Sequence, residues 1–423
     1  MKLPVIGFVG MTHLGLVSGV SAAEKGFSLV CYDPDTSLIK ELNALKLPVS
    51  EPQLEELVKK NIDSIKFTSE ITELQNCDVV YVAPDVSTDD NGQSNLTTIN
   101  HLLENVFNAI QTETVIVILS QVPPGFTRGK QRDGRILYYQ VETLIFGRAV
   151  ERALYPERYI IGCSNPSQPI PKNFQIFLDA HKCPLLPMRY ESAELAKISV
   201  NMCLVASVTT ANTLAELCES IGADWSEIVP ALKLDKRIGQ YSYLAPGLGI
   251  AGGNLERDLA TVCNFADRYG TDAGVVRAWI SNSKHRKDWP LRALHKEVLS
   301  KNTNAIIGIW GLAYKQDTHS IKNSPSLALL QAIPESQIRV FDPVVPASVV
   351  PNKKYVAAIS ELDACLGADV LIVMTPWEQF SKVNPNDILN KMSGKLILDP
   401  YNVLNKSELI KLGFKYLTLG VSN

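Results

Sequence analysis

The sequence lacks the cysteine and histidine spacings that mark metal sites and redox motifs. Its eight cysteines stand far apart, no C-x-x-C occurs, and the six histidines are dispersed without metal-ligand spacing. Dispersed cysteines of this kind are typical of a protein kept in a reducing compartment. The sequence therefore predicts a cytoplasmic protein with reduced cysteines and no bound metal.

An excess of charge of one sign and long apolar runs are also missing. The formal net charge is -3 and the pI is about 6.1, which argues against nucleic acid or an anionic membrane as partner. No apolar stretch is expected to reach the roughly 20 residues of a spanning helix. The N-terminal residues run straight into a glycine turn, so we expect a first strand there and not a signal peptide. With 423 residues, a soluble protein of two or three domains is expected.

Apolar runs alternate with helical patterns in the first part of the chain. Residues 4–9 form a short apolar run, followed by a glycine turn, a helix-like stretch and a second apolar run at 27–33. This order is typical of a βαβ unit. Further strands are expected at 78–83, 114–119 and 159–162. The alternation predicts an α/β fold whose parallel sheet is covered on both faces.

The pattern changes twice further along the chain. Residues 190–222 and 255–300 show helical periodicity, the second stretch broken at Trp289-Pro290. Strand-like runs return at 305–312 and recur at 340–343, 368–375 and 396–399. The sequence therefore predicts three domains: a Rossmann domain over 1–187, a central helical domain over 188–300 and a Rossmann-like α/β domain over 301–423.

The turn after the first strand matches a dinucleotide-binding fingerprint with one departure. Such a turn reads G-x-G-x-x-G, with an acidic residue about 20 positions later. Thr12 stands at the middle glycine, where it either shifts the phosphates or hydrogen-bonds one of them. Asp33 would accept a hydrogen bond from a ribose 2'-hydroxyl and repel a 2'-phosphate, so NAD is favoured over NADP. A plain α/β turn with a structural aspartate is the alternative. The expected cofactor contacts here are Gly10, Thr12, His13, Leu14, Gly15 and Asp33.

Residues 247–258 read G-L-G-I-A-G-G-N-L-E-R-D, a glycine-rich loop that leads into a helix-like stretch. The segment resembles the catalytic loop of the UDP-glucose/GDP-mannose dehydrogenase family, G-x-G-F-G-G-S-C-F-P-K-D. Gly247, Gly249, Gly252 and Asp258 match that pattern, whereas Asn254 falls where the family keeps its cysteine nucleophile. A carboxamide cannot replace a thiolate as a nucleophile.

The resemblance extends along nearly the whole chain. Further segments similar to family motifs are S-Q-V-P-P-G at 120–125, N-G-Q-S-N-L at 91–96, E-S-A-E-L-A-K-I-S-V-N at 191–201, G-L-A-Y-K at 311–315 and T-P-W-E-Q-F at 375–380. The resemblance implies an N-terminal NAD domain, a central dimerisation domain and a C-terminal domain for the nucleotide diphosphate. It also implies oxidation of a sugar C6 alcohol to a carboxylate through two hydride transfers to NAD, the cysteine trapping the aldehyde between them.

The resemblance assigns catalytic roles to a few residues of this chain. Lys197 and Asn201 are four residues apart on an expected helix, so both face one side. The lysine would stabilise an alkoxide and the asparagine would orient it. Asp258 would hold a catalytic water, and Glu142 aligns with a family glutamate although its flanking residues differ. Asn254 fills the position of the thiol. A solvated helix residue is the alternative for Lys197 and Asp258.

The departures concentrate in the equipment for the second oxidation and for substrate recognition. Gln121 replaces a threonine that helps to bind the catalytic water, Phe146 replaces a glutamate, and Tyr401 replaces an arginine that contacts the substrate. Arg257 replaces the lysine beside the catalytic aspartate. The remaining contacts implied by the resemblance are Val86, Gln121 and Lys315 for the cofactor, and Arg237, Tyr243, Gly249 and Gly252 for the substrate.

Three hypotheses follow from these patterns. The first is an NAD(H)-dependent oxidoreductase limited to one two-electron alcohol/carbonyl step on a nucleotide-linked sugar. The second is a full four-electron sugar dehydrogenase that uses a different trap, and the third is a catalytically silent binding or regulatory homologue. A homodimer is also expected, because apolar residues recur at helical steps in Val200, Leu204, Val208, Ala211, Leu214 and Leu217. Arg237, from either the same or the second subunit, is expected near the substrate.

Overall fold

The structure, a computed structural model, describes residues 2–89, 93–352 and 354–422. Asn91 and Gly92 of the 91–96 motif therefore lie outside the described residues. The chain forms two compact units, residues 1–200 and 201–423. Helix α8 (Tyr190–Ile221) contains the boundary between them. The three-part division at residues 187 and 300 remains a prediction.

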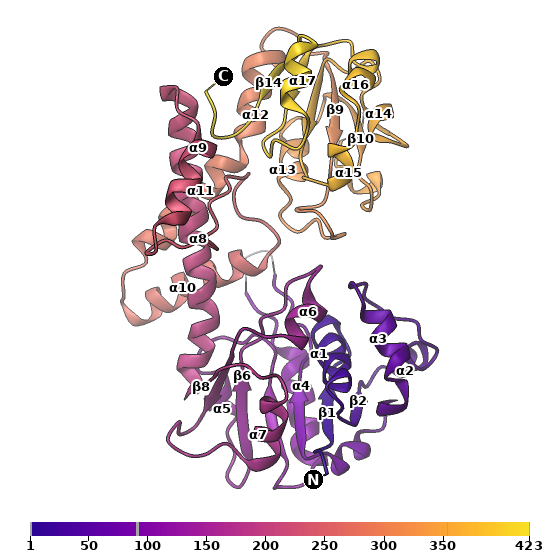
Figure 1. Ribbon diagram of the computed structural model, residues 1–423, viewed down its shortest axis with the longest axis vertical. Coiled ribbons are helices and arrows are strands. Elements are labelled where there is room, and N and C mark those ends of the chain that lie inside the picture. Colours follow the sequence, from indigo (N-terminus) through magenta and orange to yellow (C-terminus); the bar gives the residue numbers. More distant parts are fainter. Residues whose placement is uncertain (1, 90–92, 353, 423) are drawn as a thin grey trace. The chain divides into compact units, whose positions relative to one another are not determined.

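The first unit is built on a sheet of the doubly wound type (Figure 1). Its described strands follow the order β3-β2-β1-β4-β5-β6-β7-β8, and only the β6–β7 pair is antiparallel. The order reverses between β1 and β4, which is where such sheets bind ligands at the carboxyl ends of their strands. The strands are β1 (Ile6–Val9), β2 (Leu29–Tyr32), β3 (Ile65–Thr68), β4 (Val79–Val82), β5 (Val115–Ile118), β6 (Ile136–Gln140), β7 (Tyr159–Cys163) and β8 (Leu185–Arg189).

Alternate residues of these strands pack on opposite faces of the sheet. Phe8 and Tyr81 belong to a core that also contains buried residues of α1 (His13–Glu24), α6 (Ala149–Leu154) and α7 (Lys172–Asp179). Val9 and Val82 belong to a second core with α4 (Thr97–Ala109). Both faces are therefore covered, as the uninterrupted apolar runs predict. The shorter helices are α2 (Thr36–Asn43), α3 (Leu54–Lys60), α5 (Phe126–Lys130), and the 3-10 turns Ile62–Ser64 and Ile71–Asn76.

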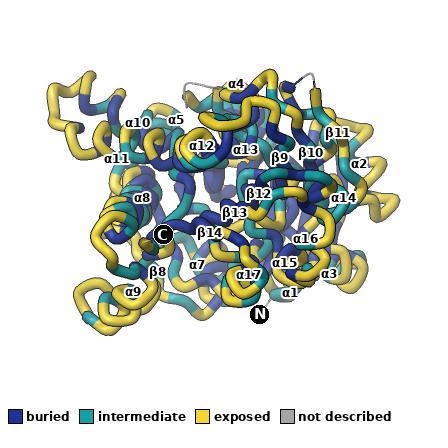
Figure 2. Tube along the Cα trace, turned by 90° about the horizontal axis from the view of Figure 1, so that it is seen from above, coloured by how far each residue is buried: buried dark blue, intermediate teal, exposed yellow. Residues whose placement is uncertain are grey.

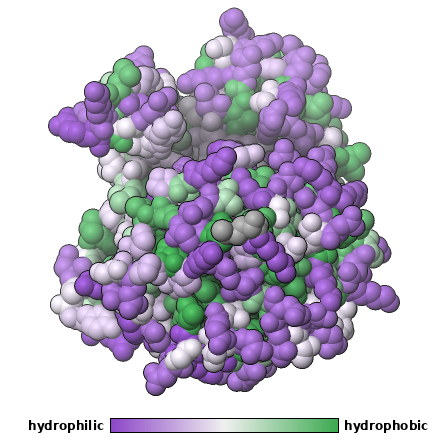
Figure 3. All heavy atoms as spheres, turned by 60° about the horizontal axis from the view of Figure 1, so that its bottom comes forward, coloured by the Kyte–Doolittle hydropathy of each residue, from purple (hydrophilic) through white to green (hydrophobic). Residues whose placement is uncertain are grey.

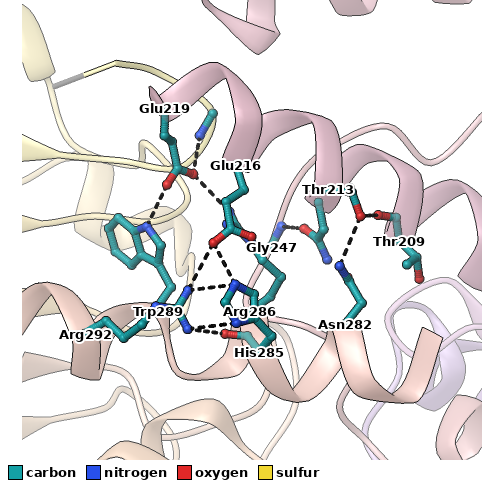
Figure 4. Close-up of polar contacts among 12 residues, drawn as sticks. Thr209, Thr213, Glu216, Glu219, Gly247, Asn282, His285, Arg286, Trp289 and Arg292 are labelled. Atoms are coloured by element: carbon teal, nitrogen blue, oxygen red, sulfur yellow. Dashed lines mark hydrogen bonds and ion pairs between the residues drawn. The ribbon is translucent and has the colours of Figure 1, made fainter. Parts of the chain in front are cut away.

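Helices open the second unit, and a polar network holds them together (Figure 4). Arg286 is fully buried and pairs with Glu216 at 3.2 Å and Glu219 at 3.0 Å, both on α8. Trp289 donates its ring N–H to Glu219 at 3.1 Å. A buried charge of this kind is tolerated only when it is paired and hydrogen-bonded. The helices are α9 (Trp225–Leu234), α10 (Asn254–Tyr269), α11 (Gly274–Lys287), α12 (Trp289–Leu294) and the π-helix His295–Leu299.

The second unit also contains a parallel sheet, with the order β11-β10-β9-β12-β13-β14 among the described residues. The tube in Figure 2 shows its central strands buried while the helices around them are exposed on their outer sides. Its strands are β9 (Ile306–Trp310), β10 (Gln337–Phe341), β11 (Tyr355–Ala357), β12 (Val370–Val373), β13 (Leu396–Leu398) and β14 (Lys415–Leu417). Its helices are α13 (Pro325–Ala332), α14 (Glu361–Ala364), α15 (Glu378–Ser381), α16 (Pro385–Lys391), α17 (Lys406–Lys411) and the 3-10 turn Ala347–Val349.

Helix α8 corrects the expectation that no stretch could span a membrane. By length and composition it is long and apolar enough, the one such helix in the part of the chain that the structure describes. Only 33% of its most apolar window is buried. A single helix of this kind is weak evidence for a membrane span, since core and interface helices share the same composition.

The surface of the molecule on the face seen in Figure 3 is mostly hydrophilic, with apolar residues in small groups.

Candidate functional site

The glycine turn of the first unit has the close packing that a dinucleotide turn requires. Gly10 has a φ of +90°, and a side chain there would meet the backbone of Pro84 at 2.9 Å. A Cβ on Gly15 would lie 1.9 Å from the Gly10 carbonyl oxygen. Both positions therefore require glycine. The turn delivers the chain into α1, whose N-terminal amide groups can bind a phosphate.

Asp33 lies where the turn meets the end of β2. Its carboxylate is buried and accepts hydrogen bonds from the amides of Met11 at 2.7 Å and Asp35 at 3.0 Å. These bonds fix the carboxylate at the edge where a ribose would bind. His13, which follows the N-cap residue, contacts Glu51 at 2.9 Å, and the Phe146 ring packs on it with a centroid distance of 4.3 Å.

Thr12 takes an unexpected role in the turn. It is the N-cap residue of α1, yet its side chain caps none of the helix amides. Its hydroxyl instead accepts a hydrogen bond from the amide of Asp85, in the loop after β4, at 2.8 Å. The Thr12 oxygen is thus used as a hydrogen-bond acceptor within the protein, whereas the hydroxyl proton can still be donated to a phosphate. Leu14 is buried, and Val86, next to Asp85, is half-buried.

Glu142 and Lys197 form an ion pair in the first unit. Their charged atoms are 3.0 Å apart, and the side chains are only 17% and 15% exposed. Leu144 donates its amide to Glu142 at 2.7 Å, which fixes the carboxylate. The sequence alone placed these residues 55 positions apart, and the fold brings them into contact. An ammonium in this shielded place can stabilise a developing alkoxide.

A buried carboxylate fixes the first part of α8. Glu194 is fully buried and accepts the amides of Gly125 at 2.6 Å and Thr127 at 2.8 Å. Burial raises the pKa of Glu194, opposed by these hydrogen bonds. Because Glu194 is one turn before Lys197, it sets where that lysine lies relative to the loop after β5. Gln121, on the same loop, is partly buried.

Asn201, Arg257 and Asp258 form a buried cluster in the second unit. Asn201 donates its side-chain amide to one carboxylate oxygen of Asp258, and Arg257 Nε donates to the other at 3.2 Å. Asp258 is 1% exposed and Arg257 is 5% exposed. Both carboxylate oxygens of the aspartate therefore accept hydrogen bonds from the protein, one of them from the arginine cation.

The glycine-rich loop over 247–253 is attached to three parts of the second unit. Gly247 donates its amide to Asn212 of α8 at 2.8 Å, and Ile250 donates to the Ser283 hydroxyl of α11 at 2.7 Å. Gly252 donates to the carbonyl of Lys322 at 3.0 Å. These bonds pin the loop immediately before α10, of which Asn254 is the first residue. Asn254 is exposed.

Two glycines of this loop allow close approaches that a side chain would prevent. Gly249 has a φ of +75°, and a Cβ would lie 2.3 Å from the Ser283 carbonyl oxygen. Gly252 has a φ of +93°, and a Cβ would lie 2.4 Å from the Tyr314 ring. Burial raises the pKa of the Tyr401 hydroxyl, opposed by a backbone hydrogen bond from Leu248 of this loop.

The other residues expected at the substrate are more open. Arg237 pairs with Asp235 at 2.6 Å and is 88% exposed. Tyr243 is 50% exposed. The Lys315 ammonium lies 5.8 Å from the centroid of the Tyr314 ring. Their functional roles remain predictions. Within residues 2–89, 93–352 and 354–422, no three His, Cys, Asp or Glu side chains are grouped so that they could hold a metal.

Sequence reasoning missed two acidic residues that shape the surroundings of the glycine turn in the first unit. Glu51 binds His13 and also accepts the amides of Gly147 and Ala149, so it ties the glycine turn to the start of α6. Asp85 is bonded to Thr12 across 73 positions. Such partners are distant in sequence and follow no periodic pattern. An acidic residue three positions after the end of the buried strand β4 was the available signal for Asp85.

Comparison with known proteins places the whole chain in one family. The NAD binding domain of the UDP-glucose/GDP-mannose dehydrogenase family matches residues 4–175, its central domain matches 191–284, and its UDP binding domain matches 308–406. The chain is 30% identical over 438 residues to UDP-glucose 6-dehydrogenase of Rickettsia conorii, which covers 98% of this chain and 99% of the relative. It is 27% identical to the Pseudomonas aeruginosa enzyme of the same name, with 99% and 97% covered.

Solved structures show the same fold. A UDP-glucose dehydrogenase from Pyrobaculum islandicum superposes with a TM-score of 0.84 at 24% identity, covering 96% of both chains. A UDP-D-ManNAc dehydrogenase from Pyrococcus horikoshii gives 0.82 at 22% identity, covering 98% and 99%. The expected α/β architecture, with an NAD-binding N-terminal part, a helical centre and a UDP-binding C-terminal part, is confirmed. By sequence and by fold, the chain belongs to the UDP-glucose/GDP-mannose dehydrogenase family.

Proposed function

We propose that this protein oxidises an alcohol of a nucleotide-linked sugar to a carbonyl with NAD, or runs that step in reverse, and stops after one hydride transfer. The observation that carries the proposal is the pairing of retained groups for the first step with a carboxamide, Asn254, in place of a thiol. NAD supplies a hydride acceptor when bound. Everything else in the step depends on groups of the protein.

The retained groups suit the loss of a hydroxyl proton and the charge that remains. As the C–H bond gives up its hydride, the hydroxyl proton leaves to a water held by Asp258, and the oxygen becomes a carbonyl oxygen. Lys197, held by Glu142 at 3.0 Å, stabilises the negative charge on that oxygen during the step. Asn201, one turn further along α8, is bonded to Asp258 and orients it.

The second oxidation would need a nucleophile to add to the carbonyl, and the cysteines of this chain offer a poor substitute. Cys263 is on α10 but buried. Burial raises the pKa of the Cys77 thiol to about 12, and that of Cys365 likewise to about 12, so little thiolate forms. Cys203 is exposed, but it lies six residues after Lys197, which turns it away from that face of α8.

The stoichiometry of NADH production tests the proposal. Purified protein is mixed with NAD and each of a panel of nucleotide sugars, and NADH and product mass are measured together. We expect one NADH per substrate consumed and a carbonyl product that a hydrazine traps. Cys203→Ser should leave this activity unchanged. Two NADH and a carboxylate would show that another trap exists and would overturn the single-step proposal.

A catalytically silent, ligand-binding homologue is the second candidate, and the Arg257–Asp258 contact favours it. The guanidinium occupies one oxygen of the carboxylate that would have to hold the water, at 3.2 Å. In that case NADH and nucleotide sugars bind in calorimetry, and no member of the panel is turned over. The variant Arg257→Lys then tests whether this contact is the cause of the silence. The shorter cation should release the carboxylate oxygen, and turnover should appear if Asp258 is otherwise correctly placed.

A further inference from the structure

An acidic side chain lies beside the cofactor turn. Asp85, in the loop after β4, directs a carboxylate oxygen toward the amide of Leu14 at a distance of 3.5 Å. Leu14 is the second residue of α1, so this oxygen faces the first turn of a 12-residue helix. That end of a helix carries a partial positive charge and attracts anions. At 3.5 Å the hydrogen bond is weak, so the interaction is mainly the attraction between the carboxylate charge and the helix end.

The helix offers no other carboxylate for this role. Its first turn contains no acidic residue, and the N-cap side chain of Thr12 makes no capping bond. The amides of the first turn are therefore available to an outside anion. The same amides would bind the pyrophosphate of a dinucleotide. Asp85 and the pyrophosphate thus compete for one place, and two anions there repel each other.

Thr12 holds Asp85 in this position. The Thr12 hydroxyl accepts the amide of Asp85 at 2.8 Å, while the neighbouring Pro84 packs on Gly10. The basic side chain of the turn, His13, contacts Glu51 and is not directed at Asp85 by any described contact. The two unusual residues, a threonine at the middle glycine and an aspartate in the adjoining loop, therefore form one arrangement.

We propose that Asp85, positioned by Thr12, is an internal anion that competes with the cofactor pyrophosphate for the N-terminus of α1 and so weakens NAD(H) binding. The proposal depends on cofactor binding by this domain and not on the reaction or the sugar. Asp85 is solvent-exposed, so water and salt screen part of its charge. The expected penalty is accordingly about tenfold in affinity, which corresponds to about 1.4 kcal/mol.

Isothermal titration of the full-length protein with NADH, without a sugar substrate, tests the proposal. Asp85→Asn keeps the shape of the side chain and removes its charge, and it should tighten NADH binding about tenfold at low salt. Asp89→Asn is the matched control, because Asp89 is in the same loop and its carboxylate accepts the amide of Gln93. That control should change affinity less than about twofold. Raising the salt concentration should narrow the difference between the wild type and Asp85→Asn.

A double-mutant cycle tests the coupling between the two residues. Thr12→Gly should tighten NADH binding in the wild-type background, because it releases Asp85. It should have little effect in the Asp85→Asn background. Equal NADH affinity in wild type and Asp85→Asn overturns the proposal, as does an equal gain from Asp89→Asn. If neither protein binds NADH, the proposal is also overturned, because removal of the charge should open the site. Failure to oxidise nucleotide sugars would refute the proposed function alone.

Discussion

Replacing Gly249 with alanine should displace the glycine-rich loop from Ser283, and the loss in free energy of unfolding can be worked out from the structure. The residue has a φ of +75°, which costs an alanine about 1 kcal/mol. The added Cβ would lie 2.3 Å from the Ser283 carbonyl oxygen and 2.8 Å from its hydroxyl, so the backbone must move. Overpacking of that kind costs about 1–3 kcal/mol. The hydrogen bond from Ile250 to the Ser283 hydroxyl would be lost with it, at about 1 kcal/mol.

The expected total is about 3–5 kcal/mol, and two other glycines provide controls. Gly222 has a φ of +80° with nothing within 4 Å of a Cβ, so Gly222→Ala should cost only the backbone strain. A Cβ on Gly247 would meet its nearest neighbour at 3.8 Å, so Gly247→Ala should be nearly neutral. Thermal melting and NADH formation would be measured for all three variants. Gly249→Ala should melt lowest and lose activity. If it melts within about 1 °C of Gly247→Ala, the loop is not held as we describe.

Three further predictions concern pH, cofactor choice and assembly. Burial lowers the pKa of the His181 imidazole from 6.5 to about 4 in the folded protein. As the pH falls below 6.5, the imidazole therefore takes up a proton in the unfolded chain before it does so in the folded one. The folded state has its full stability relative to the unfolded chain above pH 6.5 and loses it progressively as the pH falls toward 4. By pH 5 the loss is about 2 kcal/mol, so denaturation should show less acid sensitivity in His181→Phe than in the wild type, and equal slopes would contradict this. Calorimetry should show tighter binding of NAD than of NADP because of Asp33, and equal binding would remove that argument. Sedimentation should show a dimer, since Leu214 and Leu217 are exposed on α8, and a monomer would refute it.

Much of the fold could be predicted from the sequence because buried parallel strands are continuous apolar runs. The runs at 78–83 and 114–119 contain β4 and β5, and the helical pattern at 190–222 ends one residue after α8. Two of the strands that were missed, β8 and β14, lack such a pattern. Strand β8 is an edge strand that contains Pro187, which a central strand would not tolerate, and β14 has only three residues.

The candidate site could be predicted only in part, for a related reason. Motif matches located Lys197, Asn201 and Asp258, but they could not reveal the partners of these residues. The contact of Arg257 with Asp258 depends on side-chain direction in the first turns of α10. The contact of Glu142 with Lys197 depends on how the segment between β6 and α6 packs against α8. The dimer prediction likewise treated all the apolar residues of α8 between 200 and 217 as part of one exposed face. Ala211 is in fact fully buried in a small core with Trp225, so it cannot contribute to an exposed interface.

The attachment of the chain's last residues has a practical consequence for anyone who expresses this protein. Gly420 donates its amide to Glu219, the same carboxylate that binds Arg286, and its carbonyl accepts the amide of Trp225 at 2.8 Å. A stop codon introduced just before Gly420 would remove both bonds and uncover an indole that is 3% exposed. A chain cut before Gly420 is therefore expected to lose stability and to precipitate.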